Sequence, residues 1–362
     1  MKLHTQICDR LGIRYPIFGL THSVDVAVAI ARAGAFPMFA LGRTSLETAE
    51  ADVARLRSEI GALPWGINCF LTSSVVAETD RAAAKSALPR GHLDFVAGIR
   101  DKYRIPAPVK GNFFSNVVRS HKLIDGHAEI ALASGAPVLS TAAGAPQRLI
   151  ERAKAAGMLT VASVGTPRHA QIALAGGIDM LVAQGYDAGG HTGHIGTFAL
   201  VPQIVDAAQG RPVLAVGGIG TGRQIAAAFA MGAAGAWLGT AWLTATENHT
   251  DDQLLAKLLA AGSGDTVLTR AHSGKSARVL RSAWTDEWSR PDAPIPLEMP
   301  MQQVLTGELI AGIEEHRMSE LRYELCGQSI AYFNKPAPVA DIIDRLVAQT
   351  IEALQSVQQT FR

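Results

Sequence analysis

The chain has 362 residues and a formal net charge of +1; 48% of its residues are hydrophobic and 18% are charged. Intrinsic disorder requires low hydrophobicity with high net charge, and a nucleic-acid-binding surface usually shows as a strong basic excess, so the composition argues against both. The length suits one large α/β barrel with an appendage, or two ordinary domains.

Short apolar runs alternate with amphipathic segments through the first 240 residues. Strands alternating with helices of this length indicate parallel β/α units, and about eight such units predict a closed (β/α)8 TIM barrel, for which about 250 residues is typical. Thr44 or Ser45 is the expected N-cap of the second helix. The expected strands are residues 15–18, 36–39, 65–70, 108–114, 138–140, 158–164, 179–184, 213–216 and 236–238, and the expected helices are 24–33, 46–60, 120–133, 146–156, 167–175, 198–208 and 224–231.

Two parts of the chain depart from this alternation. Residues 72–107 are more polar and are interpreted as an insertion or an elaborated crossover that covers the barrel mouth. Residues 251–362 are charged and helical, without a strand–helix rhythm, and include the proline-rich connector PDAPIPLEMP. We therefore expect residues 1–250 to form the barrel and residues 251–362 to form a C-terminal helical appendage, of which residues 323–332 return to the barrel mouth.

The most informative segment, residues 212–240, reads PVLAVGGIGTGRQIAAAFAMGAAGAWLGT. The glycines of Gly217–Gly220 follow a strand and precede a helix, and Gly239-Thr240 follows the next strand. Glycine lets a backbone approach a phosphate closely, and a helix that begins there presents unpaired N–H groups to it. Barrels often bind phosphate in the loops after strands 7 and 8, so these two loops predict a phosphate cradle.

A Rossmann dinucleotide turn and a purely structural glycine loop are the alternatives for this segment. The order G-G-I-G-T-G does not fit G-x-G-x-x-G, and no acidic residue lies between Gly222 and Glu247 to bind a ribose. The pairing with Gly239-Thr240 favours the phosphate cradle over a structural loop.

A second segment, residues 179–196, reads DMLVAQGYDAGGHTGHIG. Its strand delivers Gln184 at the carboxyl end, where barrels keep their chemistry, and His191 follows in a glycine-rich loop. A histidine with an ordinary pKa near 6.5 can accept or donate a proton near neutrality, so His191 is the candidate catalytic residue; a loop histidine without a role is the alternative. His191 and His194 form HxxH without a third ligand nearby, so we expect no metal site.

These segments resemble the FMN-dependent nitronate monooxygenases, formerly called 2-nitropropane dioxygenases. The resemblance is carried by AQGYDAGGHTG, LVPQIVDA and RPVLAVGGIGTGRQIAAAFAMGAAGAWLGTAWLTATE, extends to PWGINCF, and reaches SGKSARVL and CGQSI in the tail. The same blocks resemble those of the FMN-dependent enoyl-acyl carrier protein reductases.

The resemblance implies an FMN in the barrel mouth and His191 as the active-site histidine beside the substrate. It implies that the ring or ribityl chain is bound by one group of residues and the phosphate by another. The implied cofactor-binding residues are Asn68, Gln184, Gly189 and Gly190 in the first group, and Gly217, Gly218, Gly220, Trp237, Leu238, Gly239 and Thr240 in or beside the second.

The substrate side departs from the family. A G-A-P-M-like motif after the first strand reads PIFGLTHSVD here, and the fourth-strand loop, often rich in aromatic residues and histidine, reads STAAGAP. The small residues indicate a wider or different pocket. Thr141 in STAAGAP and His22 in PIFGLTHSVD are candidate substrate contacts. For His22, helix capping or a solvated surface position is the alternative.

The resulting hypothesis is an FMN-dependent oxidoreductase that oxidises alkyl nitronates with O₂. The first alternative is an NAD(P)H-dependent FMN reductase of the enoyl-thioester or quinone type, and the second is a flavin-free barrel with a binding role. The expected partners are a small-molecule substrate and O₂, without nucleic acid or membrane, and a homodimer is allowed.

The cellular location is inferred from the apolar stretches of the chain and from its cysteines. The apolar stretch of residues 24–42 is interrupted by Asp25 and Arg32, and the N-terminus lacks the uninterrupted apolar region of a signal peptide. Cys8, Cys69 and Cys326 are far apart and form no CxxC, which argues against disulfides and a cysteine zinc site. We therefore expect a cytoplasmic protein, in which Cys69 is a small buried core residue.

Overall fold

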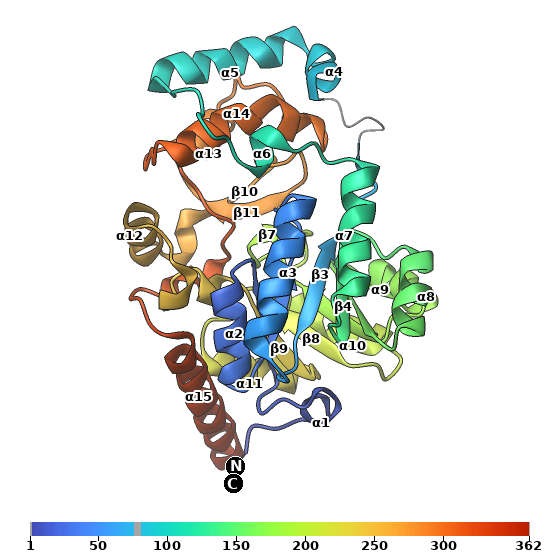
Figure 1. The fold of residues 1–362 in the computed structure, drawn as a ribbon. Helices are drawn as coiled ribbons and strands as arrows, with labels where there is room; N and C mark the ends of the chain where they lie inside the picture. The colour runs from blue at the N-terminus through green and yellow to red at the C-terminus, as the bar shows by residue number, and fades with distance from the viewer. Residues whose placement is uncertain (1, 76–80, 362) are drawn as a thin grey trace.

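The structure is a computed structural model that describes residues 2–75 and 81–361. In them, eight parallel strands close into a barrel in the order β1-β2-β3-β4-β5-β6-β8-β9 (Figure 1). Gly19 of β1 is in register with Pro37 of β2 and with Leu238 of β9, which closes the ring and confirms the predicted (β/α)8 barrel. The strands are β1 (Ile17–Thr21), β2 (Phe36–Ala40), β3 (Gly66–Phe70), β4 (Val138–Ala142), β5 (Leu159–Val164), β6 (Met180–Gln184), β8 (Val213–Val216) and β9 (Gly235–Leu238).

Seven helices follow the first seven barrel strands and bury their apolar faces against the sheet. Ser45 accepts a hydrogen bond from the amide of Thr48 and so caps α3, as predicted. Thr166 caps α9 in the same way, and Pro167 is the first residue of that helix, where its missing N–H costs nothing. These helices are α2 (Val24–Arg32), α3 (Leu46–Ile60), α7 (His121–Ala133), α8 (Gln147–Ala155), α9 (Pro167–Ala175), α10 (Thr197–Ala207) and α11 (Gly222–Ala230).

The helix beside β9 comes from the end of the chain. α15 (Val339–Thr360) packs against α11 and α2, and its buried Ile343 belongs to the same hydrophobic cluster as Ile225 of α11 and Ile30 of α2. α15 therefore occupies the position of an eighth barrel helix. At the opposite end of the chain, α1 (Gln6–Leu11) contributes Ile7 to a cluster with side chains of the barrel interior.

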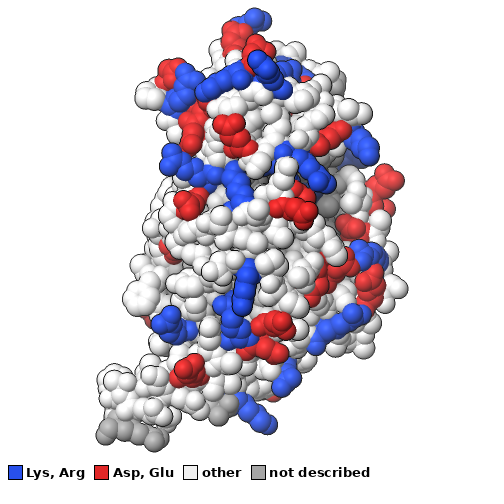
Figure 2. All heavy atoms as spheres, turned by 90° about the vertical axis from the view of Figure 1, so that its left-hand side faces the viewer, with Lys and Arg blue, Asp and Glu red and all other residues white. Residues whose placement is uncertain are grey.

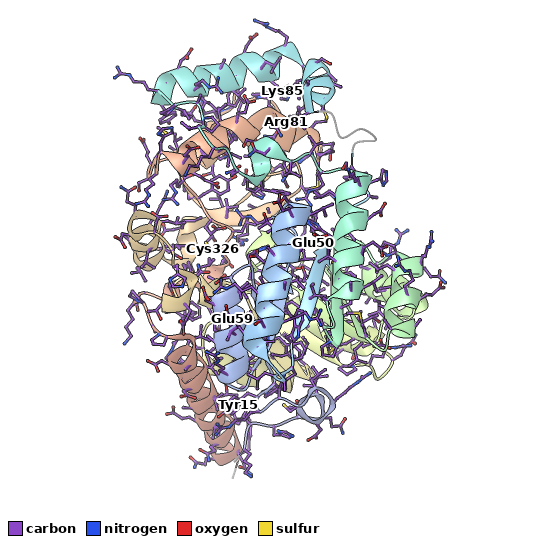
Figure 3. All side chains as sticks on the ribbon, viewed as in Figure 1. Tyr15, Glu50, Glu59, Arg81, Lys85 and Cys326 are labelled. Atoms are coloured by element: carbon purple, nitrogen blue, oxygen red, sulfur yellow. The ribbon has the colours of Figure 1, made fainter. Side chains whose placement is uncertain are left out.

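A helical layer lies above the carboxyl ends of the strands and is called the cap here (Figure 1). It joins the segment after β3 to the C-terminal part of the chain through one hydrophobic cluster. Arg81 of α4 donates to the carbonyl of Val304 on α14, and Lys85 pairs with Glu308, so both side chains point toward α14 (Figure 3). The cap consists of α4 (Arg81–Ser86), α5 (Arg90–Tyr103), α6 (Phe113–Asn116), α13 (Ala283–Glu287) and α14 (Met301–Glu315).

A small sheet lies between the barrel and the cap, in the strand order β10-β11-β7. β7 (Gly190–His191) belongs to the loop after β6, whereas β10 (Thr266–Thr269) and β11 (Ala277–Leu280) belong to the C-terminal segment. The pairing of His191 with Ala277 attaches the barrel loop to that segment. The remaining elements are α12 (Asp252–Ala260) and the 3-10 helices η1 (Thr240–Trp242), η2 (Thr246–Asn248), η3 (Ser263–Asp265) and η4 (Gln328–Tyr332).

Two sequence-based expectations are wrong in detail. Residues 108–114 form no strand; instead Asn112 accepts hydrogen bonds from the amides of Phe114 and Ser115 and starts the one-turn helix α6. Residues after 251 are not purely helical, because β10 and β11 lie among them. Each of these strands has only four residues, which is too short for a clear alternation. The division into 1–250 and 251–362 stays a prediction.

Charged side chains of both signs are interspersed over the face shown in Figure 2, and neither sign forms one continuous field there. None of the helices in the part of the chain that the structure describes has the length and apolar character needed to cross a bilayer.

Candidate active site

A cavity of about 340 Å³ opens at the carboxyl ends of the barrel strands. This is the end at which TIM barrels hold their reacting groups, and the volume lies within the roughly 300–1,000 Å³ typical of ligand pockets. The sequence-predicted residues that line it are His22, Asn68, Gln184, Gly189, Gly190, His191, Gly217, Gly218, Trp237, Leu238, Gly239 and Thr240.

Two predicted residues do not line this cavity. Thr141 is buried in β4 and its hydroxyl donates to the carbonyl of Val161, 3.4 Å away. Gly220 donates its amide to Oε1 of Gln224 at 2.8 Å, and a Cβ added at Gly220 would lie 2.6 Å from the ring of Tyr332. The structure therefore places Thr141 in the sheet and Gly220 under η4.

A larger hollow, of about 700 Å³, lies on the outside of the barrel between α2 and the start of α15. It is lined by Asp25, Arg32, Glu59 and His249 among others, and by none of the sequence-predicted site residues. We assign the chemistry to the strand-end cavity because the glycine loops and His191 meet there.

The loop that carries His191 is held from two directions. Nε2 of Gln184 donates to the backbone carbonyl of His191 at 2.8 Å, and β7 pairs with β11 on the other side. The imidazole stacks on Phe70 with ring centroids 5.0 Å apart, and its Nε2 lies 2.6 Å from Oγ of Ser273. The ring is therefore fixed in position before any ligand binds.

The protonation state of His191 differs from the expectation of a residue that titrates near neutrality. Burial first, and then the positive charges of Arg119, Lys275 and Arg43, lower the pKa of His191 to about 3. His191 is consequently a neutral imidazole over the physiological pH range, able to accept a proton only when a reaction step or a nearby anion favours it.

The loop after β8 has the backbone that a close approach requires. Gly217 and Gly218 have φ values of 120° and 67°, a region that favours glycine. One part of the predicted phosphate cradle is corrected, however. The amides of Gly220 and Thr221 donate to the side chain of Gln224, and the amide of Gly222 donates to Gln349 of α15. These N–H groups at the start of α11 are therefore already hydrogen-bonded within the protein and do not point at a phosphate site.

The second glycine loop is open. A Cβ added at Gly239 would meet nothing within 4 Å, so free space adjoins this backbone. The neighbouring Thr240 accepts a hydrogen bond from the amide of Gly327 at 2.9 Å, which brings the C-terminal segment to the cavity. A Cβ added at Gly189 would lie 2.7 Å or less from backbone atoms of Cys326, so glycine is needed where these segments meet.

Other lining residues have defined partners. Nδ2 of Asn68 donates to Oγ of Ser140 at 3.1 Å, and Nδ1 of His22 lies 2.9 Å from the carbonyl of Ala40. His22 does not cap α2, because Ser23 does so by accepting from the amide of Val26. Cys69 is fully buried, and burial raises its thiol pKa to about 12, so it is an unreactive core residue.

Sequence reasoning missed the wall of the cavity on the cap side. Nδ1 of His272 lies 2.9 Å from the hydroxyl of Tyr323, and the ring centroids of His272 and His191 are 6.0 Å apart. Ser273 belongs to the tail motif SGKSARVL, which was a usable signal. Phe70 ends the quoted motif PWGINCF, which was a second signal. No motif marks the lining residues Arg43, Phe114, Arg119, His272, Gln303 and Glu324.

No group of three or more His, Cys, Asp or Glu side chains within residues 2–75 and 81–361 is arranged to hold a metal ion. The cavity instead combines two glycine loops, side-chain amides and a neutral imidazole at the end of the barrel where α/β-barrel enzymes hold their reacting groups.

The comparisons with known proteins identify the family. The model of the nitronate monooxygenase family matches residues 5–349, so the chain belongs to this family of flavin-dependent oxidoreductases. A Mycobacterium tuberculosis protein named as a monooxygenase is 36% identical over 98% of this chain and 99% of its own length. A Staphylococcus saprophyticus protein named as a nitronate monooxygenase is 29% identical over 85% of this chain and 87% of its own.

The nitroalkane oxidase of Streptomyces ansochromogenes has a similar solved structure, with a TM-score of 0.82 and 27% identity. The likeness covers 97% of this chain and all of that one. The chain is therefore an oxidoreductase of the nitronate monooxygenase type, as the sequence motifs predicted.

Proposed function

We propose that the protein uses FMN in the strand-end cavity to oxidise alkyl nitronates with O₂. The observation that supports this most directly is that His191 lines one cavity with the two glycine loops, which follow it by 26 to 49 positions in the chain. A cofactor with a phosphate at one end and a flat ring at the other needs these two kinds of wall in one place.

The residues present fit FMN. Gly217, Gly218, Gly239 and Thr240 would hold the phosphate through backbone amides, and the open space beside Gly239 gives an anion room to approach. Asn68 and Gln184 each donate one amide N–H within the protein. Their side-chain oxygens accept no hydrogen bond from residues 2–75 and 81–361, so these oxygens could accept from the ring. Gly189 and Gly190 line the same cavity and would contact the ring or ribityl chain through their backbone, and Trp237 with Leu238 would supply apolar surface.

When bound, FMN would accept the electrons released by the substrate. His191 would act through its uncharged imidazole: its contact with Ser273 engages Nε2, so Nδ1 is left to hydrogen-bond the substrate or accept a proton from it. Phe70, stacked on the imidazole, keeps water from that side of the ring and fixes its orientation. His22 is a further substrate contact in this proposal.

An absorption spectrum of the purified protein, followed by anaerobic titrations, tests the proposal. We expect a bound flavin whose mass is that of FMN, and reduction of that flavin by an alkyl nitronate. Rapid reduction by NADPH without nitronate would instead favour the reductase alternative. A colourless protein that takes up no FMN would favour a binding role.

A cytoplasmic location and a homodimer are also proposed. The described cysteines are free and buried, which suits a reducing compartment. Cell fractionation and light scattering of the purified protein test these two points; a monomeric mass would overturn the dimer.

A further inference from the structure

The cavity wall contains a buried arginine, Arg119, between α6 and α7. Only 6% of Arg119 is exposed, and its guanidinium carbon lies 5.0 Å from the ring centroid of Phe70 and 5.6 Å from that of Phe113. Phe70 also stacks on His191, so one aromatic ring contacts both the guanidinium and the imidazole.

The charge of Arg119 is not balanced by a carboxylate. Nη2 donates to the carbonyl of Gly42 at 3.1 Å, and Nε donates to Oε1 of Gln303 at 3.4 Å; both acceptors are neutral. No ion pair to Arg119 occurs among the residues that the structure describes. Two of the five N–H donors of the guanidinium are thus used, and Nη1 has no hydrogen bond to those residues.

Arg43, a second arginine of the cavity wall, differs from Arg119 because its positive charge is paired with the carboxylate of Glu324. Its Nη1 lies 2.9 Å from Oε1 of Glu324, and although burial opposes protonation, Glu324 raises the pKa of Arg43. Burial alone lowers the pKa of Arg119 to about 10. Of the two arginines, Arg119 is therefore the one whose charge still requires an anion, because a buried unpaired charge is costly.

We propose that Arg119 binds the anionic oxygens of the substrate and selects anionic substrates over neutral ones. This inference rests on the proposed function for the identity of the substrate, but the anion site can be tested without turnover. The planar guanidinium can donate two parallel hydrogen bonds to a group with two oxygens, such as the C=NO₂⁻ group of a nitronate.

The same arrangement gives His191 a suitable setting. Arg119 is one of the cations that disfavour protonation of His191, so an anion held by Arg119 would offset part of that effect. The substrate would thereby make His191 a better proton acceptor at the moment it binds. Neutral ligands would lack both effects.

The experiment measures binding of nitrate, a planar monovalent anion that cannot be oxidised here, to the flavin-loaded protein in chloride-free buffer. We expect wild-type protein to bind nitrate in the millimolar range, competitively with nitronate, and Arg119→Gln to bind it roughly 10–100-fold more weakly. Arg119→Lys keeps the charge but loses the planar fork, so we expect intermediate affinity. Nitronate kcat/KM should fall in the same order.

Arg168→Gln is the matched control, because Arg168 is exposed on α9 and does not line the cavity. Flavin content and thermal midpoint of each variant separate a lost anion site from misfolding, and Arg119→Lys provides the answer if Arg119→Gln does not fold. Equal nitrate affinity in wild type and Arg119→Lys and Arg119→Gln, or no nitrate binding by wild type, overturns the inference. Nitrate binding that depends on Arg119 without any nitronate turnover would support the anion site and contradict the proposed function.

Discussion

Oγ of Ser273 lies 2.6 Å from Nε2 of His191, and the two residues are 82 positions apart. Ser273 comes from the C-terminal segment, whereas His191 comes from the loop after β6. Together with the pairing of Ala277 with His191, this contact makes the C-terminal segment part of the site.

Ser273→Ala should lower kcat about 5- to 10-fold, because losing one neutral hydrogen bond costs about 1 kcal/mol and leaves the imidazole free to reorient. Flavin content should be unchanged. Ser289→Ala removes the hydroxyl of a serine exposed on the cap and serves as the control. A Ser273→Ala variant with wild-type kcat, or with effects that simply add to those of His191→Asn, would show that the contact does not position His191.

His191→Asn should keep flavin bound and lower turnover of nitronate by roughly 10²-fold or more, the scale of general acid–base contributions. Flavin absorbance and steady-state kinetics measure the two effects separately. Loss of flavin together with activity would indicate that His191 is needed for the structure of the loop and not for the reaction.

Gly239→Ala should fold normally yet bind flavin about 10-fold or more weakly. The added methyl group meets no protein atom within 4 Å, so it would occupy space that the phosphate needs. Gly264→Ala is the control, because its Cβ also meets nothing within 4 Å but lies in η3, outside the cavity lining. Fluorescence titration of the flavin-free protein with FMN measures both; equal affinities would remove the Gly239 loop from the proposed cradle.

Gly189→Ala should destabilise the protein by several kcal/mol or detach the C-terminal segment from the barrel mouth. The new Cβ would lie 2.6–2.7 Å from backbone atoms of Cys326 and Gly327, which cannot rotate away as a side chain could. Gly98→Ala, on the exposed face of α5 with nothing within 4 Å, should be neutral or slightly stabilising. Urea unfolding of both variants checks the contrast, and comparable midpoints would contradict the close approach.

Stability should decline as pH falls, with His127 as one identifiable contributor. His127 is 2% exposed with Nε2 3.0 Å from the carbonyl of Thr44, and its pKa is lowered to about 4, chiefly by burial. Above pH 6.5 the side chain is neutral in both folded and unfolded chains. Between about pH 6.5 and 4 only the unfolded chain takes up the proton, so stability is lost in that window, by roughly 2 kcal/mol at pH 5 for this residue.

His127→Gln should therefore reduce the drop in unfolding free energy between pH 7.5 and pH 5 by about that amount. His316→Gln, which removes an exposed histidine, is the control. Urea unfolding at the two pH values measures the difference, and the same drop in wild type and His127→Gln would contradict a neutral, buried His127.

Much of the barrel could be predicted from local patterns. The helix α3 over Leu46–Ile60 has the predicted bounds because Ser45 signals its start. The strands β5, β6 and β8 are apolar runs, and their ends lie within a residue or two of the predicted ones. The segment before α7 was mispredicted as a strand because the Asn112 cap, a local side-chain contact, prevails over the apolar residues Phe113 and Phe114.

The sequence by itself determined the barrel, the family and twelve of the residues that line the cavity, because the glycine loops and His191 lie in short contiguous motifs. Only the tertiary structure decided how the cavity is closed. Arg119 and His272 line it from segments far apart in the chain, and Ser273 contacts His191 behind it. Whether a charge there is balanced depends on which neighbours surround it. Gln224 shows the same limit, since its contact with the Gly220 amide removes from the cradle a group that the motif alone had assigned to it.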